Sequence, residues 1–233
     1  MVGSLTRPAH AKVNLALAVA PPEPAGSPRA GWHRICSWMS AIDLHDEVTL
    51  TPHDRAGERA DASAARFVPQ VSWATDAPRA SPIDWPPEKD LCARALLALD
   101  RLLTPRGLRV PPVRITVRKR IPVGGGLGGG SSDAAATLLL AQELMGGRAL
   151  GPGRVHDLVP LDDLRQAARS IGSDVEFFLD DPCRTPEGGH LPPRPAIVSG
   201  FGDELERLAP VELPLVLLLP GVGCPTREVY RAY

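Results

Sequence analysis

Apolar and polar positions along the chain follow patterns that predict both strands and helices. The segment from Val13 to Ala20 has the apolar and small residues of a buried strand, and Val113 to Val117 alternates as a half-buried strand does. The segment Leu91–Leu103 predicts an amphipathic helix, whose apolar face is formed by Leu91, Ala95, Leu96, Leu99, Leu102 and Leu103. An Ala- and Leu-rich helix is predicted from about Ser132 to Met145, where two glycines follow and end it. We therefore expect strands and helices in one chain.

Shorter patterns complete this prediction. Further elements are a strand at Asp46–Thr51, a short strand near Phe67–Trp73, a short helix at Asp162–Ser170, and apolar stretches at Val175–Leu179, Ile197–Leu208 and Leu215–Leu219. Residues 52–88 are rich in Asp, Arg, Ala and Pro, so most of them are expected in a surface excursion. The chain stops at Tyr233 within what reads as the start of a helix, so we expect a truncated chain or a shortened C-terminal domain.

Composition narrows the class of protein. The 233 residues suffice for one large domain or two modest ones, and 43% apolar residues can bury a core. A formal net charge of −1 gives no broad attraction to nucleic acid or to an anionic membrane. The four cysteines include no CxxC pair, which gives a zinc or redox site little support. The sequence shows no secretory signal and no apolar stretch long enough to span a bilayer, so a cytoplasmic protein is expected.

The feature richest in chemistry is the run from Gly124 to Gly130, in which six of the seven residues are glycine. Glycine lets a backbone turn tightly and point several N–H groups at one anion. The run follows a predicted strand and precedes a predicted helix, for which Ser131 or Ser132 is a natural N-cap. A helix N-terminus adds partial positive charge. The order of strand, glycine loop and helix predicts a phosphate-binding site.

Other interpretations of this loop are weaker. A Walker A loop would end in Gly-Lys-Ser or Gly-Lys-Thr, and this one does not. The spacing of Gly124, Gly126 and Gly129 fits a dinucleotide-binding fingerprint, but no acidic residue ends a strand about twenty positions later. A flexible linker is the remaining alternative, which the flanking strand and helix disfavour. A DNA-binding module would need a basic stripe that the chain lacks.

The residues in and around the loop resemble the central motif of the GHMP kinases. From Pro122 the motif reads Pro-x-Gly-Gly-Gly-Leu-Gly-Gly-Gly-Ser-Ser-Asp-Ala-Ala, and it is most similar to that of the family members that act on 4-diphosphocytidyl-2-C-methyl-D-erythritol in non-mevalonate isoprenoid biosynthesis. Four further segments resemble the same kinases and occur in the expected order on both sides of the loop: Ala11–Leu15, Gly31–His33, Ile171–Val175 and Gly221–Tyr230. Trp32 stands where these kinases usually have tyrosine, and their third motif, Gly-Ser/Thr-Gly, is absent.

This resemblance implies an α+β GHMP kinase fold. Residues 1–185 are expected to form an ATP-binding domain that is ribosomal protein S5 domain 2-like, and residues 186–233 part of a ferredoxin-like C-terminal domain. The implied reaction moves the γ-phosphate of ATP onto the 2-hydroxyl of the cytidine diphosphate-linked methylerythritol. The alternatives are another GHMP kinase, of homoserine or mevalonate type, and a non-catalytic nucleotide-binding remnant that lacks the third motif.

The resemblance also assigns chemical roles. Asp174 is the expected general base for the hydroxyl, and Lys12 is expected to pair with it and to stabilise the transferring phosphoryl charge. The alternatives are a turn aspartate and an exposed strand lysine. Lysine is scarce in this chain, which has only Lys12, Lys89 and Lys119, and this scarcity favours a function for those present.

Binding residues follow in the same way. The ATP phosphates are expected at Pro122, Gly124, Gly125, Gly126, Leu127, Gly128, Gly129, Gly130, Ser131 and Ser132. The substrate is expected at Asn14, Trp32, His33, Thr226 and Tyr230, with the histidine reading the cytosine edge and an aromatic ring stacking on the base. Mg²⁺ is implied by the nucleotide, with Ser132 as the candidate contact, and Asp133 is expected to be structural. The expected partner is a small molecule, with no nucleic acid and no membrane, and the expected assembly is a monomer or homodimer.

Overall fold

The computed structural model describes residues 3–53, 66–149, 158–180 and 190–220, and these residues are organised around one mixed sheet. The strands are β1 (Leu5–Pro22), β2 (His33–Pro52), β3 (Phe67–Trp73), β4 (Val113–Lys119), β5 (Ala196–Gly200) and β6 (Glu204–Arg207). Within the sheet, β3, β4, β2, β5 and β6 are neighbours in that order, and β1 also pairs with β2. The β3–β4 pair is parallel, and the other pairs are antiparallel.

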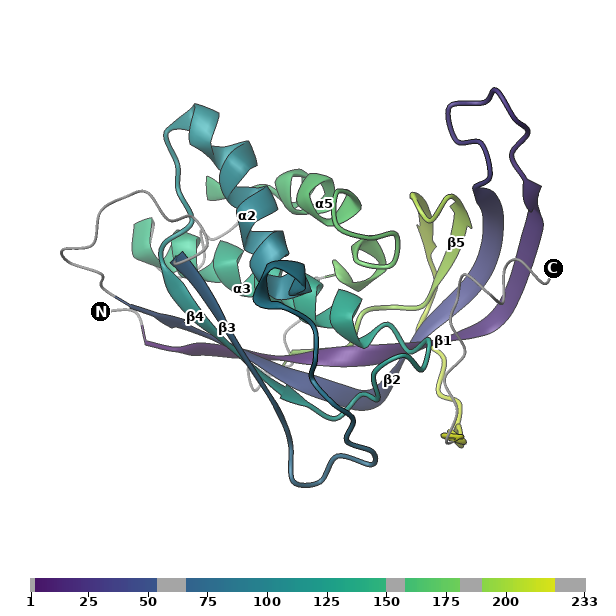
Figure 1. Cartoon of the computed structure of the whole chain (residues 1–233), viewed down its shortest axis with the longest axis horizontal. Helices are drawn as coiled ribbons and strands as arrows, with labels where there is room; N and C mark the ends of the chain where they lie inside the picture. Colours follow the sequence, from purple (N-terminus) through teal and green to yellow (C-terminus); the bar gives the residue numbers. More distant parts are fainter. Residues whose placement is uncertain (1–2, 54–65, 150–157, 181–189, 221–233) are drawn as a thin grey trace.

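The rest of the sheet is attached to the long β1–β2 hairpin through β2. β4 pairs with β2 between Glu47 and Pro52, whereas β5 pairs with β2 between Ile35 and Met39. Figure 1 shows the hairpin running below the helices and then bending upward beside β5. The strands β5 and β6 therefore extend the same sheet through β2. The division between residues 1–185 and 186–233 stays a prediction.

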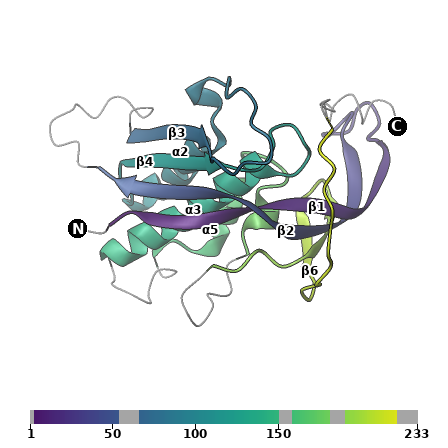
Figure 2. The same ribbon diagram turned by 90° about the horizontal axis from the view of Figure 1, so that it is seen from below.

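Three helices cover one face of this sheet: α2 (Leu91–Leu103), α3 (Gly129–Ala149) and α5 (Leu161–Arg169). The two views in Figures 1 and 2 show them together on the same side, with the strands on the other. Single 3₁₀ turns are η1 (Pro87–Lys89), η2 (Thr104–Arg106) and η3 (Glu176–Phe178). The result is a two-layer α+β arrangement, as expected.

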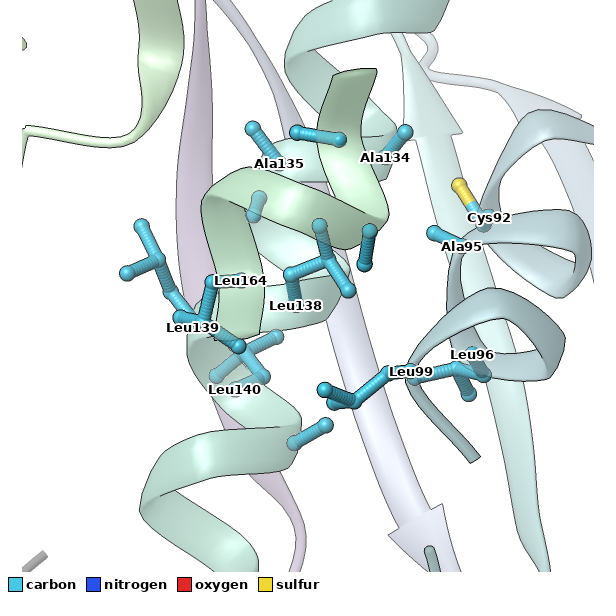
Figure 3. Close-up of a cluster of buried hydrophobic side chains, with 14 of the residues drawn as sticks. Cys92, Ala95, Leu96, Leu99, Ala134, Ala135, Leu138, Leu139, Leu140 and Leu164 are labelled. Atoms are coloured by element: carbon cyan, nitrogen blue, oxygen red, sulfur yellow. The ribbon is translucent and has the colours of Figure 1, made fainter. Parts of the chain in front are cut away.

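The core lies between these helices and the sheet, with α3 at its centre. Leu96 and Leu99 of α2 meet Leu138 of α3, and Leu164 of α5 closes the cluster from the other side (Figure 3). α3 is buried on nearly all sides, which explains why its sequence is apolar all round rather than on one face. This central helix sets where the glycine loop at its N-terminus must lie.

Most predicted elements are confirmed. The predicted helix at 91–103 is α2, the short strand at 67–73 is β3, and the strand at 113–117 is the start of β4. The helix predicted at 162–170 is α5, displaced by one residue. The stretch at 197–208 contains β5 and β6 separated by a tight turn.

Two predictions at α3 are wrong. The helix begins at Gly129 rather than Ser132, so Ser131 and Ser132 lie in its first turn and neither is the N-cap. The backbone N–H of Ser132 instead donates to the carbonyl of Gly128 at 2.8 Å. The helix also continues to Ala149 through both glycines that were expected to end it. Packing against α2, α5 and the sheet outweighs the poor helix propensity of glycine, which amounts to about 1 kcal/mol per residue.

The last described segment, residues 208–220, forms neither helix nor strand. The stretch predicted at Leu215–Leu219 has no strand partner among the described residues, and Val216 and Leu218 are largely exposed. The predicted helix start near 227–233 lies outside the described residues. Within the part of the chain that the structure describes, no helix has the length and apolar character needed to cross a membrane.

The central packing can be tested at α2. We expect Leu99→Ala to lower the free energy of unfolding by about 2–5 kcal/mol, because Leu99 is fully buried against α3 and its truncation leaves a cavity. Leu97→Ala is the matched control, since Leu97 lies on the same helix but is only partly buried. Urea denaturation followed by circular dichroism measures both. Equal losses in the two variants would contradict the arrangement.

Candidate active site

The glycine loop between β4 and α3 adopts backbone angles that favour glycine. Gly124, Gly126 and Gly128 have φ values of 77°, 70° and 71°. Residues with a side chain pay roughly 1–2 kcal/mol to adopt this left-handed conformation. The first N–H groups of α3, which starts at Gly129, follow directly and have no carbonyl partner within the helix. The loop is thus shaped to present backbone donors at a helix N-terminus.

Among the loop glycines, Gly128 lies closest to the side chains of neighbouring elements. A Cβ atom on this residue would lie 2.9 Å from Cζ of Phe178 and 3.0 Å from Cγ of Lys12, so the Phe178 ring would have to shift and Lys12 would be in very tight contact. The carbonyl of the preceding Leu127 accepts a hydrogen bond from the backbone N–H of Lys12 at 2.9 Å. The loop is therefore docked onto β1 and η3, and the side chain of Lys12 passes directly beneath it.

Three polar side chains meet at this point. Lys12 Nζ donates to Oδ1 of Asn14 at 3.0 Å and lies 3.5 Å from Oδ2 of Asp174. Asn14 follows Lys12 by two residues on β1, which places both side chains on one face of the strand. Asp174 comes from the turn before η3. The predicted pairing of Lys12 with Asp174 is confirmed.

Solvent reaches the side chain of Asp174 but hardly that of Lys12. The Lys12 side chain is 6% exposed, whereas that of Asp174 is 31% exposed. The lysine is therefore not an exposed strand residue, which was the alternative interpretation. A carboxylate that solvent can reach, next to a buried ammonium and a docked glycine loop, can accept a proton from a hydroxyl held between them. The catalytic roles themselves stay predictions.

A cavity of about 220 Å³ opens on the other side of the loop. The end formed by the glycine loop is lined by Pro122 and by the residues from Val123 to Gly130, which include most of the residues predicted to bind ATP. Its other end is lined by the more apolar side chains of Val71, Trp85 and Leu91. Sequence analysis missed this apolar end, because nothing local marks residues from β3, α2 and the loop before α2 as neighbours.

Ser131 and Ser132 are placed differently from the rest of the loop. They are not among the residues that line this cavity. Ser132 is buried and instead borders a much smaller cavity next to Arg7 and His10 of β1. The prediction that Ser132 contacts a magnesium ion stays a prediction, and no described contact supports it.

Below the cavity lies a buried cluster of charges that sequence analysis also missed. Lys119 at the end of β4 donates to Asp46 of β2 and, at 2.7 Å, to Oδ2 of Asp133 in the first turn of α3. None of the three residues is more than 5% exposed. Oδ1 of Asp46 also accepts hydrogen bonds from the backbone N–H groups of Arg120 and Ile121, the second at 2.8 Å. The scarcity of lysine was the only signal in the sequence for this cluster.

The cluster contains two carboxylates and one ammonium group, and their pKa values respond to that imbalance. Burial lowers the pKa of Lys119, but the two carboxylates raise it by more, so this ammonium stays charged. Burial raises the pKa of Asp133; Lys119 opposes the shift and Asp46 adds to it, and together they bring this pKa to about 8. Burial and the neighbouring carboxylate thus shift Asp133 toward its protonated form. The expectation that Asp133 is structural stays a prediction.

The predicted cytosine-binding residues lie apart from Lys12. His33 is the first residue of β2 and pairs with Pro22 of β1. Pro22 lies ten residues beyond Lys12 on that strand. Its Nδ1 lies 2.8 Å from the carbonyl oxygen of Ala20. Trp32 is 59% exposed and lies edge-on to Phe201, with ring centroids 6.3 Å apart. The predicted residues Thr226 and Tyr230 lie outside the described residues.

Comparisons with known proteins agree with this fold. Residues 90–179, which contain α2, the glycine loop and Asp174, match the family model "GHMP kinases N terminal domain". This part of the chain is therefore similar to the N-terminal domain of the GHMP kinases. Among its relatives, the chain is 34% identical over 98% of its length to a 4-diphosphocytidyl-2-C-methyl-D-erythritol kinase of Pelotomaculum thermopropionicum. It is 37% identical over 97% of its length to the kinase of the same name from Caulobacter vibrioides.

A solved structure gives the same result. The chain is similar to a crystal structure of 4-(cytidine 5′-diphospho)-2C-methyl-D-erythritol kinase, with a TM-score of 0.57 and 31% identity over 98% of this chain. The chain spans somewhat less than two thirds of these proteins: 63% and 62% of the two relatives and 64% of the solved chain. The GHMP kinase fold is therefore confirmed for this chain.

The docking of the loop can be tested at Gly128. We expect Gly128→Ala to cost about 1–3 kcal/mol more stability than Gly124→Ala, because its Cβ would collide with Phe178 and Lys12. Gly124 is the matched control, since it shares the positive φ but has open space around it. Thermal and urea unfolding of both variants measure the difference. If Gly124→Ala were the more damaging change, the loop would not be docked as described.

The charge cluster predicts a pH dependence of stability. Because folding raises the pKa of Asp133, the folded chain holds a proton that the unfolded chain releases, and stability from this group is lost as pH rises from about 4 to about 8. Asp133→Asn removes this loss, so its stability relative to the unchanged protein should increase with pH over that window. Urea unfolding at intervals from pH 5 to 9 tests this. A constant difference across the series would contradict it.

Proposed function

We propose that this chain forms the nucleotide-binding and phosphoryl-transfer part of an ATP-dependent kinase that phosphorylates the 2-hydroxyl of 4-diphosphocytidyl-2-C-methyl-D-erythritol. The observation that carries the proposal is the Lys12–Asp174 pair directly beneath the docked glycine loop. The names of its relatives, which match over nearly the whole chain, support the choice of substrate. The place of the reaction is non-mevalonate isoprenoid biosynthesis.

The glycine loop is proposed to hold the phosphates of ATP. Backbone N–H groups of the loop and of the first turn of α3 would donate to the phosphate oxygens, and the positive end of the helix dipole adds to the attraction. The base would occupy the apolar end of the cavity near Trp85 and Leu91. Phosphoryl transfer depends mostly on such positioning and charge stabilisation, because little covalent chemistry is required of the protein.

Asp174 and Lys12 are proposed to act at the acceptor hydroxyl. The Asp174 carboxylate would orient the hydroxyl and accept its proton as the oxygen attacks the γ-phosphorus. The Lys12 ammonium, held by Asn14 and Asp174, would stabilise the charge on the attacking oxygen and on the transferring group. Because Lys12 also lies against Gly128, its ammonium is close to where the phosphates are proposed to bind.

The cytidine end of the substrate is proposed to bind along the β1–β2 hairpin toward His33 and Trp32. The exposed ring of Trp32 offers a stacking surface, and Arg29 and Arg34 lie near the adjacent Phe201 ring. This arrangement places basic and aromatic groups at the end of the hairpin, as a cytidine diphosphate would require. Cytoplasmic location and a monomeric or homodimeric state also stay predictions.

Mg²⁺ is proposed to enter with the nucleotide. Within the described residues no group of three or more His, Cys, Asp or Glu side chains is arranged to hold a metal ion. This fits Mg²⁺, which is usually bound through substrate phosphates, several waters and only one or two carboxylates. When bound, the ion would screen the charge of the β- and γ-phosphates.

Turnover tests the assignment. We expect Asp174→Asn to lower kcat by about 10²- to 10⁴-fold while ATP-analogue binding persists, because only the proton acceptor is lost. Asp162→Asn is the control, since Asp162 is an exposed acid on α5, and it should leave kcat unchanged. Phosphate transfer from ATP with Mg²⁺ and the cytidine-linked substrate, followed by product analysis, gives the readout. Full activity in Asp174→Asn would remove this residue from the mechanism.

The same assay separates the alternative functions. Turnover of homoserine or mevalonate without turnover of the cytidine-linked substrate would refute the proposed substrate. Binding of an ATP analogue by calorimetry without phosphate transfer to any of the three would favour a non-catalytic nucleotide-binding chain.

A further inference from the structure

The turn that carries Asp174 is held loosely by its own hydrogen bonds. Within this turn the backbone N–H of Val175 donates to the carbonyl of Gly172 at 3.3 Å. The Asp174 carboxylate accepts from Oγ of Ser173 at 3.3 Å and lies 3.5 Å from Nζ of Lys12. Well-formed hydrogen bonds are shorter than about 3.2 Å, so these contacts alone hold the carboxylate weakly. A proton acceptor has to keep a fixed position relative to the reacting hydroxyl, which calls for a further support.

The turn between β5 and β6 packs against the residue before Asp174. A Cβ atom added to Gly202 would lie 3.0 Å from Cβ of Ser173 and 3.4 Å from its carbonyl oxygen. Gly202 is buried, whereas Ser173 is exposed. Both atoms of Ser173 belong to the backbone or are bonded directly to it, so they cannot turn away as the end of a long side chain can. The β5–β6 turn therefore limits where the backbone beside Asp174 can lie.

Hydrogen bonds close the β5–β6 turn on itself. Gly200 and Gly202 have φ values of 67° and 91°, in the left-handed region that favours glycine. The backbone N–H of Gly202 donates to the carbonyl of Ser199 at 3.1 Å. The backbone N–H of Phe201 donates to Oδ1 of Asp203 at 2.9 Å. These bonds give the turn a defined shape, so it can serve as a fixed support.

The β5–β6 turn is also joined to the end of the β1–β2 hairpin. Cζ of Arg29 lies 4.2 Å from the ring centroid of Phe201, and its guanidinium donates to Oδ2 of Asp203 at 3.5 Å. Trp32 packs edge-on against the same ring. Figure 1 shows β5 beside the hairpin where the hairpin bends upward. The turn thus contacts the proposed cytidine-binding end of the hairpin as well as the turn that carries Asp174.

We propose that Gly202 is a positioning residue for Asp174. Because Gly202 has no side chain, the β5–β6 turn packs closely enough against Ser173 to hold the Asp174 carboxylate next to Lys12. The inference rests on the proposed role of Asp174 as the proton acceptor, and it adds the residue that keeps this acceptor in place. Since the same turn contacts the end of the hairpin, one element holds the acceptor and the proposed cytidine site in a fixed relation.

Turnover of two matched glycine variants tests this role. We expect Gly202→Ala to lower kcat about tenfold and to leave KM for ATP within about twofold, because a small shift of Asp174 misaligns the acceptor. Gly107→Ala is the control and should keep kcat within about twofold, since Gly107 also has a positive φ, 72°, but has open space around it between η2 and β4. The kcat values are normalised to folded protein by the stoichiometry of ATP-analogue binding in calorimetry. Equal kcat values in the two variants would overturn the proposal.

A double-mutant cycle separates positioning from a general loss of stability. Ser173→Gly removes the Cβ atom that lies closest to Gly202. In that background Gly202→Ala should therefore lower kcat by no more than about threefold, because residues in contact show non-additive effects. A loss of the same size in both backgrounds would show that the contact with Ser173 is not the cause, and the positioning role would be refuted.

A variant at the exposed partner does not depend on how Gly202→Ala folds. Ser173→Val crowds the same contact from the other side, and we expect it to lower kcat about tenfold relative to Ser173→Ala, which loses only the hydroxyl. No difference between these two serine variants would contradict the proposal. If the unchanged protein transfers no phosphate to the cytidine-linked substrate, the proposed function fails. If it does so and Gly202→Ala keeps full kcat, only this inference fails.

Discussion

The ion cluster of Lys119, Asp46 and Asp133 is the interaction on which the candidate site depends. It joins β2, the end of β4 and the first turn of α3 at one buried point. Burying a polar or charged group without a partner is costly, and Lys119 donates to both aspartates, so the three elements meet at this point. The glycine loop connects two of these elements, and its two ends are therefore held by the same cluster.

The loop also sets the position of Lys12, which pairs with Asp174. Its early part is anchored because Asp46 accepts the backbone N–H groups that precede the loop, and its last part begins α3. Between these ends Gly128 lies against Lys12 so closely that no side chain fits. The position of the ammonium relative to the loop is thus determined by backbone contact. For this reason, the same contacts hold the proposed phosphate site and the proposed proton acceptor in place relative to each other.

Local patterns in the sequence predicted the elements whose formation depends on local chemistry. The apolar face of α2 and the alternation of β4 both appear where expected, because periodicity reflects which face is buried. The predicted start of α3 was wrong. Glycine and serine have weak helix preferences, and packing around a buried central helix overrides them. The apolar end of the cavity was missed because β3, α2 and the segment before α2 become neighbours only in the folded sheet.

The sequence by itself determined that a glycine-rich loop joins a strand to a helix, and the order of its short motifs pointed to a resemblance to the GHMP kinases. It also pointed to Lys12 and Asp174, although the two lie far apart in the chain. Only the tertiary structure decided that Lys12 is buried, that it meets Asp174, and that Asp133 and Asp46 share one lysine. The reason is physical: side-chain type and spacing follow from neighbouring residues, whereas burial and the charge state it imposes depend on elements brought together by the whole sheet.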